Sequence, residues 1–128
     1  MFPNIIQVPL YDFLNNYTSI CLTDKIGKYI ITMPALKLVQ VVDVWRSKGG
    51  VVIYDIMDEW EEFFRVGQAP WYEKQIEKNL VLKSDYVSAV SPALCRKFES
   101  IRKDIAVIGN GYSRNLLGME KRGIAIER

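Results

Sequence analysis

The sequence predicts an α/β fold with an open parallel sheet, and three observations lead to this prediction. Short apolar runs rich in β-branched residues recur along the chain. Between them lie segments whose apolar residues repeat at helical spacing, separated by glycine and proline. This alternation is typical of repeated βαβ units, and right-handed crossovers make such strands parallel. The carboxyl ends of the strands are therefore expected along a single edge, where open α/β sheets bind ligands.

The composition is typical of a soluble globular domain with a hydrophobic core. The chain has 128 residues, of which 49% are hydrophobic and 25% charged. Its 17 basic and 15 acidic residues are mixed without a polybasic block, so no nucleic acid partner is expected. No apolar run has the length of a membrane span, and no signal peptide opens the chain. We expect a cytoplasmic protein, with the inner face of the membrane as a candidate location.

Histidine is absent, which removes the commonest general base and excludes Ser-His-Asp and Cys-His catalysis. Cys21 and Cys95 have neither metal-ligand nor redox spacing, so both are predicted to be free thiols in a reducing compartment. No metal ion and no cofactor is expected.

The first part of the chain predicts a short strand over residues 5–8, ended by Pro9, and then a short amphipathic helix over residues 10–17. Residues 29–32 predict the next strand. Met33-Pro34 marks its end and the start of a helix, because proline suits the first helical turn.

The helix that starts at Pro34 is predicted to run up to Gly49-Gly50, with Leu38, Val41, Val42 and Trp45 on one face. A strand is the alternative, because the four valines between residues 39 and 44 have weak helix propensity. Helix is preferred because two buried strands flank the segment and need a crossover. Gly49-Gly50 ends it, and residues 51–54, apolar on both faces, predict a strand buried on both sides.

The second half continues the alternation. The predicted elements are a helical turn over 60–64, a helix beginning at Pro70, a strand over 85–90, a helix capped by Ser91 and a strand over 105–108. Residues 1–113 are read as a single domain and residues 114–128 as a charged C-terminal tail.

Acidic residues follow the central strand and predict a site. Asp55, Asp58 and Glu59 follow the end of the apolar strand predicted over residues 51–54. Carboxylates crowded together can accept protons or bind hydroxyl groups. The structural alternative for Asp58 is a simple cap on the turn that follows. For Asp55, which lies between Tyr54 and Ile56, functional and structural roles stay equally open.

The same edge should carry further polar groups from the other strand ends. Ser91 begins a helix with free N–H groups that suit an anion or a sugar hydroxyl, although an ordinary cap would also explain it. Asn110-Gly111 has a simple alternative as a turn. The residues expected to bind substrate are Met33, Pro34, Glu59, Ser88, Ser91, Asn110 and Gly111.

The order of these motifs resembles a known family. VVIYDIMDEWEEF, then SDYVSAVSPALCRKF, then IAVIGNGYS is similar to the N-terminal domain of nucleotide-sugar glycosyltransferases of the GT-B type, which have two facing Rossmann-like domains. The resemblance covers about residues 28–113. It departs at Gly109, where proline is usual, and at Tyr112-Ser113, where an aliphatic residue and Asp are common.

The resemblance implies a three-layer Rossmann-like sheet, as an incomplete N-terminal half of a GT-B architecture. It implies that Asp55 and Asp58 face an acceptor as catalytic residues, and that a nucleotide-sugar donor and a sugar or lipid-linked acceptor are the partners. The family's earlier Gly-rich βα unit and its donor-binding C-terminal domain have no match here. The chain alone is therefore expected to bind donor weakly and to transfer little sugar.

Two other functions remain open. A non-catalytic module, a degenerate half-enzyme pairing with a partner subunit, would show an exposed apolar face and would self-associate. A receiver-like domain could use clustered acids to hold Mg²⁺. It would need a lysine at a late strand end, where this chain has Gly109-Asn110-Gly111.

Overall fold

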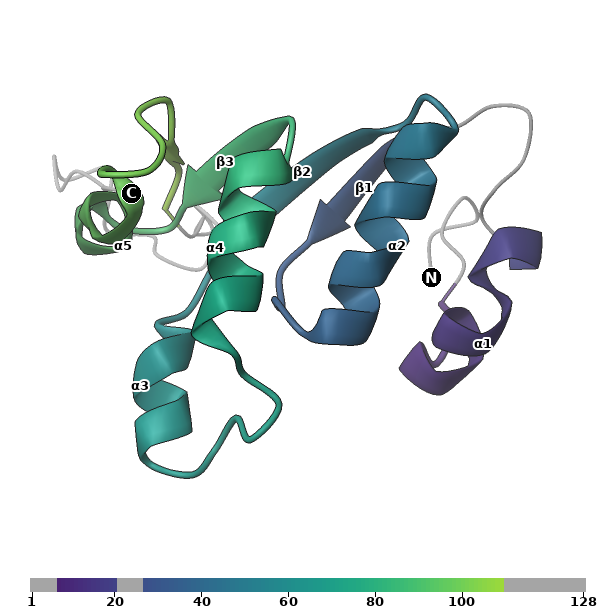
Figure 1. Ribbon diagram of the computed structural model, residues 1–128, viewed down its shortest axis with the longest axis horizontal. Coiled ribbons are helices and arrows are strands. Elements are labelled where there is room, and N and C mark those ends of the chain that lie inside the picture. Colours follow the sequence, from purple (N-terminus) through teal and green to yellow (C-terminus); the bar gives the residue numbers. More distant parts are fainter. Residues whose placement is uncertain (1–6, 21–26, 110–128) are drawn as a thin grey trace, which may run out of the picture.

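The computed structural model describes residues 7–20 and 27–109 (Figure 1). From β1 onward, one or two helices separate successive strands, as the sequence predicts. The order is α1 Leu10–Ile20, β1 Lys28–Ile31, α2 Leu36–Ser47, β2 Val51–Ile56, α3 Trp60–Arg65, α4 Lys74–Lys83, β3 Tyr86–Ala89, α5 Pro92–Phe98 and β4 Ala106–Val107. The expected strand over residues 5–8 and the tail over 114–128 lie wholly or mainly outside the described residues.

The four strands form one parallel sheet in the order β1-β2-β3-β4, which confirms the α/β prediction and is consistent with a Rossmann-like fold. Each strand pairs with the next one in sequence. Because right-handed crossovers in one direction carry every connecting segment to the same side, this order places the helices on a single face. The strand order does not reverse within the described residues, so they contain no topological switch point.

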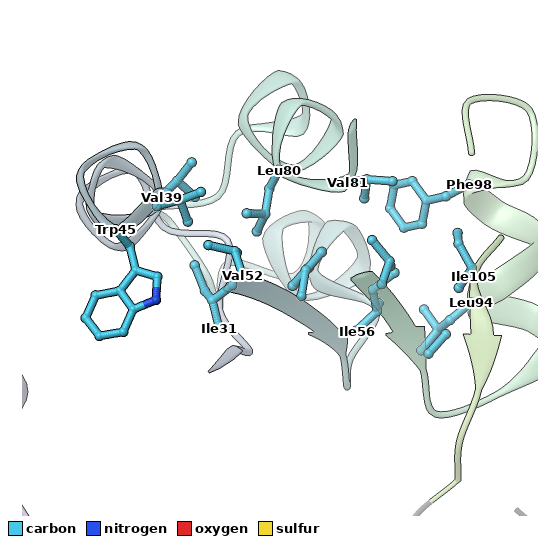
Figure 2. Close-up of a cluster of buried hydrophobic side chains, with 14 residues drawn as sticks. Ile31, Val39, Trp45, Val52, Ile56, Leu80, Val81, Leu94, Phe98 and Ile105 are labelled. Atoms are coloured by element: carbon cyan, nitrogen blue, oxygen red, sulfur yellow. The ribbon is translucent and has the colours of Figure 1, made fainter. Parts of the chain in front are cut away.

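The helix-covered face holds the core. Val52, Tyr54 and Ile56 of β2 alternate with half-buried neighbours and are fully buried. They pack with α2, α4 and α5 in a single cluster, shown in Figure 2. Figure 1 shows α2 and α4 side by side on this face. The ring of Phe13 from α1 stacks 6.4 Å from that of Tyr29, so α1 extends the same layer beyond β1.

The opposite face of the sheet is not covered by any described element. Its middle row pairs Ile30, Ile53 and Tyr86 across three strands, and Ile30 and Tyr86 are 60% and 62% exposed. The expectation that β2 is buried on both sides is therefore wrong for the part of the chain that is described. Residues 7–20 and 27–109 build two layers of the predicted three.

The end of α2 shows why the central strand starts where it does. Gly49 has φ 88°, a left-handed conformation that favours glycine. The N–H of Gly49 donates to Arg46 O, and that of Gly50 donates to Trp45 O. These are the two hydrogen bonds of a Schellman cap, which satisfies the last carbonyls of the helix. The chain leaves this cap directly into β2.

Three predicted boundaries moved. The helix expected from Pro70 begins at Lys74 with Glu73 as its N-cap, and Tyr72 lies before it. Pro34 is buried before α2 rather than inside its first turn, since the N-cap is Ala35. β2 also runs two residues further than predicted, so Asp55 is part of the strand.

Candidate functional site

The closest polar pairing among the predicted site residues joins Asp55 and Ser88. They are register partners on β2 and β3, and the Ser88 hydroxyl donates to Asp55 Oδ1 at 2.8 Å. Both side chains are half-buried on the uncovered face of the sheet, near its carboxyl edge. Asp55 Oδ2 has no hydrogen bond from any described residue, so it can accept one from a ligand hydroxyl.

Met33 and Pro34 follow β1 at the same edge of the sheet. Met33 is half-buried and Pro34 is fully buried. Since Ile31 pairs with Tyr54, the two residues lie one strand away from the Asp55 end of β2. Both residues therefore lie at the carboxyl edge of the sheet, where Pro34 is a buried packing residue.

Asp58 and Glu59 occupy the loop between β2 and α3. The N-cap position of α3 is Glu59, without a side-chain cap bond, so the interpretation of Asp58 as the cap is wrong. The Glu59 carboxylate instead ion-pairs with Lys97 of α5. Glu59 is therefore held toward the helical layer and away from the Asp55–Ser88 pair.

Ser91 caps α5 as the sequence predicts. Its Oγ accepts a hydrogen bond from the N–H of Leu94 at 3.3 Å, and Pro92 follows at the first helical position. The cap uses the hydroxyl, so substrate binding is not needed to explain Ser91. Asn110 and Gly111 lie outside the described residues.

A charged network behind this edge was not predicted. Lys97 pairs with Glu59 and, at 3.1 Å, with Glu61. The hydrogen bond from Lys97 is the main cause that holds the pKa of Glu61 below its usual range. Burial by itself lowers the pKa of Lys97, but the hydrogen bonds to the two glutamates outweigh it and the pKa is raised.

Glu77 of α4 forms the buried part of the same region. Its side chain is 1% exposed and accepts hydrogen bonds from the hydroxyls of Tyr54 at 2.6 Å and Tyr72 at 2.7 Å. Burial raises the pKa of Glu77, although both hydroxyls oppose the shift. Burial likewise raises the pKa of both tyrosines, which stay neutral. The sequence of α4 does not indicate that Glu77 is a buried hydrogen-bond acceptor, because a glutamate near the start of a helix is usually exposed to solvent.

Within residues 7–20 and 27–109, no group of three acidic or cysteine side chains could hold a metal ion. Cys95 is a free thiol as predicted, and Cys21 lies outside the described residues. None of the helices described is long and apolar enough to cross a membrane.

The site and fold define a parallel α/β domain with a carboxylate–hydroxyl pair at the carboxyl edge of its sheet. Comparisons with protein-family models, with curated proteins and with solved structures each find no match to this chain.

Proposed function

We propose that this chain is a glycosyltransferase-like domain whose carboxyl edge binds the hydroxyls of a sugar acceptor. The observation that carries the proposal is the Asp55–Ser88 pair. The serine holds one carboxylate oxygen at 2.8 Å and so orients the other, which has no described partner. A fixed carboxylate is a suitable acceptor for a sugar hydroxyl. The resemblance of the motifs around Asp55, Ser91 and Asn110 to GT-B enzymes supports the same function.

In the proposed reaction, the acceptor oxygen forms a bond to the anomeric carbon of a nucleotide-sugar and the nucleoside diphosphate leaves. The acceptor hydroxyl must lose its proton to a base. With histidine absent, Asp55 is the carboxylate proposed for that step, and Asp58 lies three residues further along the chain. Most of the donor site would belong to a second domain, so the chain alone should bind acceptor better than donor.

Replacing Asp55 with asparagine tests this role. Asparagine keeps the size and can still accept from Ser88, but it loses the charge that strengthens a hydrogen bond from a sugar hydroxyl. Acceptor affinity should fall about tenfold, measured by titration calorimetry with a panel of mono- and disaccharides. Asp43→Asn is the matched control, because Asp43 is an exposed carboxylate of α2 paired only with Lys83 among described residues. Equal affinities for the two variants would contradict the proposal.

The uncovered sheet face favours a second candidate, a non-catalytic half-enzyme that pairs with a partner subunit. All-parallel sheets are nearly always covered on both faces. Here Ile30, Ile53 and Tyr86 form an apolar row without a described cover. Lys28 lies at one end of this face and Asp55 toward the other, about 13 Å along the strands. A second copy turned antiparallel would place Lys28 of each copy opposite Asp55 of the other, so we take a second copy as the partner.

Light scattering tests the second candidate. It predicts a concentration-dependent dimer, and Tyr86→Lys should return the protein to a monomer because it places a charge in the apolar row. Tyr11→Lys is the matched control, since Tyr11 is 77% exposed on α1 and lies off this face. A wild-type protein that stays monomeric at every concentration would rule the candidate out.

A further inference from the structure

A pocket of about 290 Å³ opens on the helical layer, away from the Asp55–Ser88 pair. Its lining comes from α3, from the residues before and within α4, and from the end of α5 with the turn after it. Asp55 lies on the opposite, uncovered face of the sheet, so the pocket is separate from the proposed acceptor site. Its lining residues are Glu61, Tyr72, Lys74, Lys78, Lys97, Phe98, Ser100 and Ile101.

The lining carries more positive than negative charge. It holds three lysines and one acidic residue, Glu61. That carboxylate is already shared by three cations, with Lys97 at 3.1 Å, Lys74 at 3.5 Å and Arg65 at 3.6 Å. Lys78 has no acidic partner among the described residues. Glu59 also ion-pairs with Lys97 from outside the lining, so the three lysines face two carboxylates. An anion entering the pocket would therefore still meet a net positive charge.

The three lysines come from α4 and α5 and line the same pocket. Lys74 and Lys78 are one turn apart on α4, and like charges at this spacing destabilise a helix. Lys97 comes from α5 with its side chain only 20% exposed. A bound anion would offset the repulsion between Lys74 and Lys78. Lys97, which already pairs with Glu59 and Glu61, adds a third ammonium group at the pocket.

The remaining lining suits an anion attached to a less polar body. Ser100 adds a hydroxyl that can donate or accept. Phe98 and Ile101 supply an apolar floor, and Phe98 is buried. Lysine ammonium groups bind phosphate as point charges from several directions, which matches three lysines around one cavity.

We propose that this pocket binds a phosphate group, held by Lys74, Lys78 and Lys97 with Ser100 as a further hydrogen-bonding partner. Free inorganic phosphate and a phosphorylated small molecule share this chemistry. The apolar lining favours the phosphorylated molecule, because its less polar part could pack on the surface that Phe98 and Ile101 show to the pocket, which a free ion could not.

The test is a titration of the full-length chain with inorganic phosphate and, separately, with a hexose phosphate, followed by amide chemical shifts. Saturable shifts are expected at Ser100 and Ile101, with tighter binding of the hexose phosphate. Equal affinity for both would assign the pocket to the free ion and still support a phosphate site. Lys78→Gln should weaken binding about tenfold, because it removes a charge-assisted hydrogen bond.

Two further variants keep the result interpretable. Ser100→Ala removes a hydroxyl with no charge change and should weaken binding less than Lys78→Gln. Lys48→Gln removes the same charge from an exposed position after α2 and should leave binding unchanged. The proposal is overturned if no saturable binding occurs, or if Lys48→Gln weakens binding as much as Lys78→Gln. Shifts confined to Asp55 and Ser88 would also overturn it, because they would place the bound phosphate at the proposed acceptor site.

Discussion

Replacing Glu77 with alanine is expected to lower the free energy of unfolding by about 3 kcal/mol or more. The change leaves the hydroxyls of Tyr54 and Tyr72 without their acceptor in a region where both rings are buried. Each buried donor left unpaired costs about 1–3 kcal/mol, and the lost side-chain volume adds a cavity. Urea unfolding followed by circular dichroism measures the effect.

Two variants distinguish the stability lost with the Glu77 hydrogen bonds from the effect of replacing any glutamate of this region. Glu77→Gln keeps the shape and one acceptor oxygen, so it should cost less than Glu77→Ala. Glu73→Ala changes an exposed glutamate four residues earlier, whose side chain makes no cap bond, and should lie within about 0.5 kcal/mol of wild type. If Glu77→Ala were as stable as Glu73→Ala, the buried network would not matter for folding.

The raised pKa of Glu77 also predicts how stability depends on pH. Because burial raises the pKa above the ordinary 4.5, the folded protein binds this proton more tightly than the unfolded chain. This tighter proton binding contributes to the stability of the folded protein. The contribution is fully present below pH 4.5 and is lost as the pH rises through the raised pKa of Glu77 in the folded state. The stability of wild type relative to Glu77→Gln should therefore fall as pH rises. A difference that grew with pH would mean that the folded state favours the ionised glutamate.

Replacing Arg102 with alanine is expected to cost about 2–4 kcal/mol of stability. Its guanidinium donates to the carbonyls of Val81 at 2.9 Å, Ser84 at 2.6 Å and Asp85 at 3.0 Å. These carbonyls end α4 and lead into β3, where the helix dipole is negative. The side chain is 13% exposed, so water cannot easily replace all three bonds.

Lys103→Ala is the matched control, because Lys103 is the exposed neighbour of Arg102. It should change the thermal midpoint and the urea midpoint little, whereas Arg102→Ala should lower both. Arg102→Lys should lie between them, since one ammonium group cannot reproduce the planar fork of the guanidinium. Equal midpoints for Arg102→Ala and Lys103→Ala would show that the three carbonyls find other donors.

The sequence was informative about elements whose pattern is local. The run Val51–Tyr54 and the Ser91-Pro92 start of α5 predict a strand and a capped helix from neighbouring residues alone, and both are confirmed. The alternation of strands and helices also predicts the parallel sheet, because the crossover rule has one hand. The register of Asp55 against Ser88 follows from that sheet but requires the structure.

The sequence was uninformative about contacts between distant segments. The Lys97 partners Glu59 and Glu61 lie more than thirty residues away, and nothing in their spacing indicates the pairing. Glu77 has the spacing of a core position on α4 but the chemistry of a surface residue. The strand order is equally hidden, because consecutive crossovers can continue in one direction or reverse. Here all the crossovers continue in one direction, so one face of the described sheet is uncovered.

The most direct test of the proposed acceptor site is an amide shift map of the wild-type protein titrated with acceptor sugars and with a nucleotide-sugar. Saturable shifts are expected at Asp55, Ser88 and the loop to Glu59, with tighter binding of an acceptor than of the donor. These shifts should be lost in Asp55→Asn and kept in Asp43→Asn. Sugars that shift none of these amides, or that shift only residues on the helical layer, would contradict it.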